Sequence, residues 1–121
     1  MKVLLGFGDD ETSVDALERT VERASIADDE LTVAVVDDEA DGSREELEAT
    51  VESVTEEADL PVEIRHVEGT AGSQLVDIAE SEGFDEIVLG GSTTSPMGKI
   101  NINKTAEFVL LNSHVTVTLV R

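Results

Sequence analysis

The sequence predicts a single α/β domain built on an open, parallel, five-stranded sheet with helices on both faces. Two patterns predict it. Short continuous apolar runs, typical of strands covered on both faces, alternate with stretches whose apolar residues recur every three or four positions, typical of amphipathic helices. The 121 residues show no second composition zone, repeat or linker, so we take residues 1–121 as one domain. Strands that alternate with helices run parallel and are joined by right-handed crossovers.

The first predicted unit is a strand, a helix and a second strand. The strand is the apolar run Val3–Phe7. The helix follows from apolar residues at three- and four-residue spacing, and Thr12 or Ser13 is its expected cap; these residues are Val14, Leu17, Val21 and Ala24. The second buried strand is Leu31–Val36.

The second unit contributes another helix and a strand with one face more exposed to solvent. Ser43 and Glu46 fit a capping box, and an apolar row follows them. Pro61 closes this helix, because proline cannot continue the hydrogen-bond pattern. Residues 62–67 then alternate between apolar and polar, as in a strand. The apolar row of the helix is Leu47, Val51, Val54 and Ala58.

The last two units follow from glycines and apolar spacing. Gly69 and Gly72 mark a turn before a short helix that ends near Gly83. A fourth strand covers residues 86–90, and a Gly-, Ser- and Thr-rich loop runs from Gly90 to about Gly98. The final helix is indicated by Ile102, Ala106, Val109 and Leu110, and residues 115–120 form the last strand.

The charge balance excludes several functions. Asp and Glu number 28 against 8 Lys and Arg, for a net charge of −20, which repels nucleic-acid phosphates and anionic lipids. This acidity fits either a generic acidic protein or adaptation to a salt-rich cytoplasm. It is spread over every helix and not gathered in one tail, which favours the salt adaptation. No cysteine is present, so disulfides, thiolate metal sites and cysteine nucleophiles are excluded.

No signal peptide or membrane span is visible, so we expect a cytoplasmic protein.

The loop after the fourth strand is the strongest candidate for chemistry. In open parallel sheets ligands bind beyond the carboxyl ends of the strands. Glycines, small hydroxyls and a following helix suit a phosphate, and Lys99 and Lys104 make a local positive region. The same composition also fits an ordinary surface loop. Neither a Walker loop nor a Gly-x-Gly-x-x-Gly motif occurs.

Over essentially its whole length the chain resembles a universal stress protein domain. The resemblance rests on the first strand and its loop, residues 3–13, on Ile87–Gly90, on residues 106–111, and on the closing strand. Gly90-Gly91 followed by residues 95–99 resembles members from salt-loving archaea. The resemblance implies an adenine nucleotide alpha hydrolase-like sheet with strand order 3-2-1-4-5.

The resemblance also implies a nucleotide site, from which this sequence departs. Nucleotide-binding members carry Gly-x-x-Gly, nine residues, then Gly-Ser or Gly-Thr. Here only the first glycine is kept, and an aspartate of the first strand is replaced by glycine, with acids displaced to positions 9 and 10. Lys104 could bind a phosphate or fill the phosphate pocket itself. The site residues carried over are Gly8, Asp9, Val36, Gly90, Gly91, Thr93, Gly98, Asn103 and Lys104.

The function expected is therefore a non-enzymatic universal stress protein with a degenerate nucleotide-binding loop. Three alternatives stay open: an ATP-binding member with slow hydrolysis, a cleft for another anion or adenine nucleotide, and an interaction module with a vestigial cleft. Intact glycines at the motif positions would support ATP binding, whereas the residues found there, Thr93, Asn103 and Lys104, argue against it. No catalytic residue and no metal site are expected.

Other chemistry-bearing residues have weaker interpretations. Asp9 and Asp10 could hold a cation or indicate a response-regulator receiver, but the acid and lysine that a receiver needs after later strands are missing. His66 and His114 are expected in a strand and a turn, without a nucleophile beside them.

The last strand predicts a homodimer. A strand at the sheet edge exposes unpaired backbone groups, which a second copy would satisfy. Dimerisation through the last strand is also what the family resemblance implies. The expected interface residues are Val115, Val117 and Leu119, and the open alternative is a covered edge in a monomer.

Overall fold

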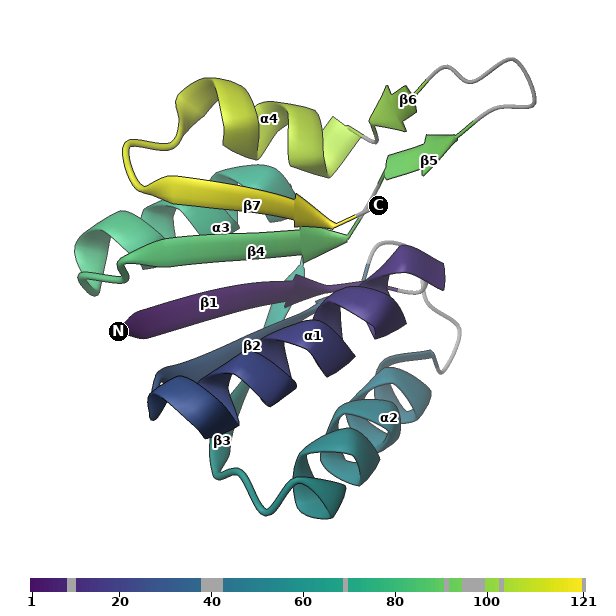
Figure 1. The fold of residues 1–121 in the computed structure, drawn as a ribbon. Coiled ribbons are helices and arrows are strands. Elements are labelled where there is room, and N and C mark those ends of the chain that lie inside the picture. Colours follow the sequence, from purple (N-terminus) through teal and green to yellow (C-terminus); the bar gives the residue numbers. More distant parts are fainter. Residues whose placement is uncertain are drawn as a thin grey trace.

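A five-stranded parallel sheet forms the centre of the protein, in the order β3-β2-β1-β4-β7 (Figure 1). The structure is a computed structural model and describes residues 1–8, 11–37, 43–68, 70–90, 92–94, 100–102 and 104–120. The prediction of five parallel strands in the order 3-2-1-4-5 is confirmed. The strands are β1 (Lys2–Phe7), β2 (Glu30–Asp37), β3 (Val62–Glu68), β4 (Glu86–Gly90) and β7 (Thr116–Val120).

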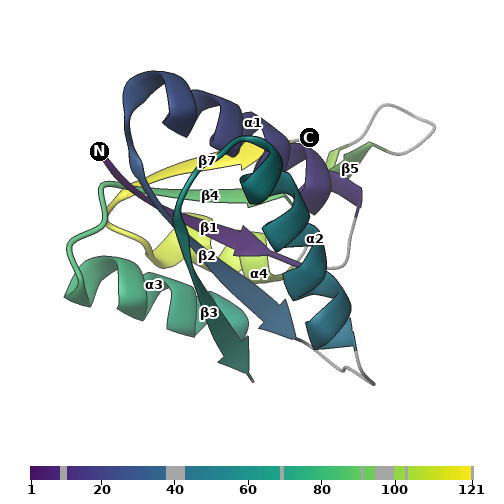
Figure 2. The same ribbon diagram turned by 90° about the horizontal axis from the view of Figure 1, so that it is seen from below.

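Helices cover both faces of this sheet, as the crossovers require (Figure 2). Helices α1 (Glu11–Ala27) and α2 (Ser43–Glu57) pack on one face, and α3 (Ala71–Ser81) and α4 (Lys104–Asn112) on the other. Each face has its own core: Leu5, Phe7 and Leu17 belong to the first, and Leu4 and Leu75 to the second. All five of these side chains are almost completely buried.

The central strand β1 pairs with β2 on one side and with β4 on the other. Its residues from Val3 to Phe7 are buried, which is why the sequence reads as a continuous apolar run. Gly6 has no room for a side chain, because an added Cβ would lie 2.6 Å from a methyl carbon of Leu89. The glycine therefore lets α3 and the sheet pack closely.

A two-stranded antiparallel hairpin follows β4, in place of the irregular loop expected over residues 90–98. It is formed by β5 (Ser92–Thr94) and β6 (Ile100–Ile102), and it projects beyond the sheet (Figure 1). The placement of Ile102 in the final helix was wrong: it lies in β6, and α4 begins at Lys104. Threonine and isoleucine favour extended backbone, so these two short segments form strands within a loop-like composition.

Two further boundary predictions were wrong. Helix α1 begins at Glu11, so Thr12 and Ser13 lie inside its first turn, and the Ser13 hydroxyl accepts a hydrogen bond from the Gly8 N–H at 3.1 Å. Gly72 lies within α3 and not in the turn before it, and its lack of a side chain leaves room for Phe108 of α4. In contrast, the helix end near Gly83 is confirmed, with φ of +73° at this glycine.

None of the helices in the described ranges is both long enough and apolar enough to cross a membrane.

Candidate functional site at the carboxyl ends of the strands

Three of the predicted site residues lie at neighbouring strand ends. Gly8 directly follows β1, Val36 is near the end of β2, and Gly90 is the last residue of β4. Because β1 lies between β2 and β4, the fold brings these ends to one edge of the sheet. This is the edge at which ligands bind in open parallel sheets.

The end of β1 is held by a local hydrogen bond. The Gly8 N–H donates to the hydroxyl of Ser13, which is buried in the first turn of α1. The strand therefore turns into the helix within a few residues, and the amino end of α1 points at the candidate site. Position 8 supplies no side chain, so it contributes backbone groups alone.

The connection from β4 to α4 holds the other predicted residues. Thr93 lies in β5, where its Cα pairs with that of Asn101 in β6. Lys104 is the first residue of α4 and its side chain is exposed. Asp9, Gly91, Gly98 and Asn103 lie outside the described residues, as does the predicted cation-binding residue Asp10.

The two histidines have acidic neighbours elsewhere in the fold. The Nε2 atom of His66 lies 3.3 Å from a carboxylate oxygen of Glu48, and the Nδ1 atom of His114 lies 2.9 Å from one of Glu80. Within the part of the chain that the structure describes, no group of three or more histidine or acidic side chains could hold a metal ion.

The predicted interface residues lie on one side of the edge strand. Val115, Val117 and Leu119 are half-buried and pack against the core under α3 and α4. The opposite row of β7 carries Thr116 and Thr118, both exposed, toward the α1 side.

Sequence reasoning missed a polar cluster on the α1 side of the sheet. Glu86, at the start of β4, is only 4% exposed. Its carboxylate accepts a hydrogen bond from the Thr118 hydroxyl and lies 3.4 Å from the Arg23 guanidinium. The signal was present, since Glu86 is an acid at the head of an otherwise apolar strand.

Comparison with known proteins agrees with the fold. The profile of the Universal stress protein family matches residues 1–121. The chain belongs to the universal stress protein family. A search of curated proteins by sequence gave no match.

Solved universal stress proteins have the same fold. A universal stress protein from Archaeoglobus fulgidus superimposes with a TM-score of 0.82 at 17% identity, covering 100% of this chain and 98% of that one. A universal stress protein solved in complex with cAMP has a TM-score of 0.77 at 20% identity, covering 100% and 96%. Another structure from A. fulgidus, in complex with dAMP, has a TM-score of 0.71 at 16% identity, covering 100% and 98%.

Proposed function

We propose that this universal stress protein is a cytoplasmic, non-enzymatic, homodimeric stress-response domain whose nucleotide-binding loop is degenerate. The observation that carries the proposal is the hairpin between β4 and α4. It occupies the segment in which nucleotide-binding members carry their spaced glycines.

Backbone pairing in the hairpin supports the proposal that the phosphate-binding loop is degenerate. A phosphate cradle needs successive N–H groups that are free to point at one ligand. Thr93, at the position of the second glycine, is instead paired with Asn101 in an antiparallel ladder. In such a ladder the N–H groups point alternately to the partner strand and away from it, so they do not converge on one anion.

The end of β1 supports the same conclusion. The family's aspartate faces the nucleotide from this strand end, and position 8 here is glycine. The Gly8 N–H is also engaged by Ser13. The described residues therefore fit an adenine nucleotide poorly, and we assign no step to one.

The second candidate is an ATP-binding domain with slow hydrolysis. It is favoured by two relatives whose structures hold cAMP and dAMP. It is also favoured by the position of Lys104, whose ammonium could meet a phosphate at the start of α4.

Calorimetry with Mg-ATP in molar KCl separates the two candidates. We expect the natural chain to bind ATP more weakly than about 1 mM, and micromolar binding would overturn the degenerate loop. The double variant Asn103→Gly with Lys104→Ser should regain binding if the rest of the loop keeps its path. The single variant Lys104→Ser is the matched control, because it removes the charge without restoring the glycine.

Two features of the β7 edge support the homodimer. Strand β7 ends the sheet, so one row of its backbone groups has no partner strand among the described residues. Helix α4 beside it exposes Leu110 (41%) and Leu111 (76%). Phe108 packs toward Gly72 of α3, so Leu110, two residues on, points to the side away from α3, toward the free edge.

The mass in solution tests the dimer. Light scattering of the full chain in molar KCl should give a dimer that dissociates on dilution. A monomeric mass at high micromolar concentration would overturn this part of the proposal and leave the nucleotide question untouched.

A further inference from the structure

A cavity lies on the α1 face of the sheet and extends along it from Glu86 to Val120. Its volume is about 300 Å³, and it lies between α1 and the strands β1, β4 and β7. Its polar end is at the beginning of the strands, where Glu86 opens β4 and Asp29 precedes β2. None of the described residues of the candidate nucleotide site lines this cavity, so the inference goes beyond the proposed function.

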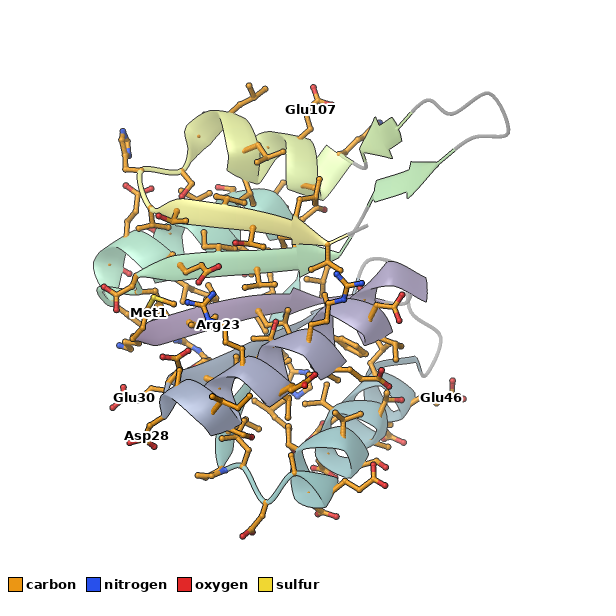
Figure 3. All side chains as sticks on the ribbon, viewed as in Figure 1. Met1, Arg23, Asp28, Glu30, Glu46 and Glu107 are labelled. Carbon is orange, nitrogen blue, oxygen red and sulfur yellow. The ribbon has the colours of Figure 1, made fainter. Side chains whose placement is uncertain are left out.

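The inner wall of the cavity carries two buried carboxylates. The side chains of Asp29 and Glu86 are 5% and 6% exposed. Arg23 lies between them, with Nε 3.8 Å from Asp29 and Nη1 3.4 Å from Glu86, and the amino group of Met1 lies 3.2 Å from Asp29. Figure 3 shows Arg23 extending from α1 toward the sheet near Met1.

Both hydroxyls of the cavity already donate their hydrogens to the protein. Thr20 donates to the carbonyl oxygen of Ala16 at 2.6 Å, and Thr118 donates to Glu86. Each hydroxyl therefore offers only oxygen lone pairs to a ligand. A carboxylate accepts at about four positions, so Glu86 also keeps acceptor capacity. This end of the cavity favours a ligand that donates hydrogen bonds, such as an ammonium group.

Arg19 supplies the opposite chemistry at the rim. It lines the cavity one helical turn from Arg23, about 6 Å along the helix axis. Its exposed side chain forms no hydrogen bond or ion pair with any residue that the structure describes. A free guanidinium fork matches a carboxylate.

The size, polarity and charge of the cavity narrow the class of ligand that it can bind. Val3, Val88 and Val120 give the cavity an apolar floor, and 300 Å³ is at the small end of ligand pockets. Asp29 is already paired with Arg23 and with the amino group of Met1, so Glu86 and Arg19 are the opposite charges left to meet a ligand, and a ligand that carries both charges matches them. The field of a chain with net charge −20 opposes free anions but not a zwitterion.

We propose that this cavity binds a small aliphatic zwitterion of the amino-acid type. The ammonium lies against Glu86 and Thr118, the carboxylate against Arg19, and the aliphatic part on the three valines. The cavity thereby gives this stress protein a ligand site that is independent of nucleotide.

The test is an NMR titration of the full-length chain in molar KCl with L-leucine, followed at the backbone amides. We expect saturable shifts at Val88 and Thr118 that excess Mg-ATP does not reverse. The two half-ligands, 4-methylpentanoate without the ammonium and 3-methylbutylamine without the carboxylate, should each bind at least about tenfold more weakly.

Two variants test whether Arg19 binds the carboxylate of the ligand. Arg19→Gln should weaken leucine binding at least about tenfold, and it should fold because Arg19 is exposed. Arg65→Gln makes the same charge change on β3, at the far edge of the sheet, and should leave the affinity unchanged. The proposal is overturned by any of four results: no saturable shift, shifts confined to Gly8 and Gly90, equal binding of 4-methylpentanoate, or unchanged affinity in Arg19→Gln.

Discussion

Replacing Gly72 by alanine tests how closely α3 and α4 approach each other. An added Cβ at this position would lie 2.9 Å from the Cβ of Phe108 and 3.1 and 3.2 Å from its Cδ1 and Cγ. Carbon atoms prefer about 3.5–4.0 Å, so the nearest contact is about 0.6 Å too short. The Cβ of Phe108 is fixed to the α4 backbone, so a change of rotamer cannot relieve it.

The expected cost follows from two opposing effects. Overpacking of this kind costs about 1–3 kcal/mol, while alanine gains about 1 kcal/mol over glycine within a helix. We therefore expect the variant to lose up to about 2 kcal/mol of unfolding free energy. Urea unfolding followed by circular dichroism, in constant KCl, measures this loss.

Two control variants isolate the contact. Ser73→Ala changes the next residue of α3, which is exposed, and should be neutral or slightly stabilising. In a Phe108→Ala background Gly72→Ala should cost less, because two of the three short contacts are gone. If Gly72→Ala stabilises the protein as much as Ser73→Ala does, the close approach of the two helices is refuted.

Three further predictions concern the polar cluster around Glu86, the β7 edge of the sheet and the net charge of the chain. Glu86→Gln should lower the unfolding free energy by about 1–3 kcal/mol in urea, because the hydrogen bond from the Thr118 hydroxyl loses its charged, buried acceptor; the exposed Arg23 adds little. An unchanged midpoint would contradict this role. Leu110→Glu should raise the dimer dissociation constant at least about tenfold in sedimentation equilibrium. The control Ile26→Glu, at an apolar position on α1 that is 82% exposed, should leave this constant unchanged. Equal effects of the two variants would exclude the β7 edge as the dimer interface. Finally, thermal unfolding should shift to higher temperature as KCl rises, because salt screens the repulsion within a chain of net charge −20, and an unchanged midpoint would argue against this repulsion.

The order and type of the main elements could be predicted because burial leaves a clear trace in the sequence. Leu4 and Leu5 are each buried on a different face, which explains the unbroken apolar run. The hairpin could not be predicted, because Ser92–Thr94 and Ile100–Ile102 are too short to show a period. Gly72 was misplaced because its contact with Phe108 joins residues far apart in the chain.

The candidate site was predictable only in part. The fold itself places Gly8, Val36 and Gly90 at one edge, since they end neighbouring strands. The cluster of Arg23, Glu86 and Thr118 depends on three elements that meet only in three dimensions. No spacing along the chain could indicate it.

The central position of β1 has a consequence for how the chain reaches its native state. Its first neighbour is β2, which follows soon in sequence, but its second is β4, which begins at Glu86. Closing that separation costs chain entropy before any contact compensates for it, and such topologies fold slowly. During synthesis, one flank of β1 therefore stays uncovered until most of the chain has left the ribosome, and this unpaired apolar strand is exposed to aggregation in that interval.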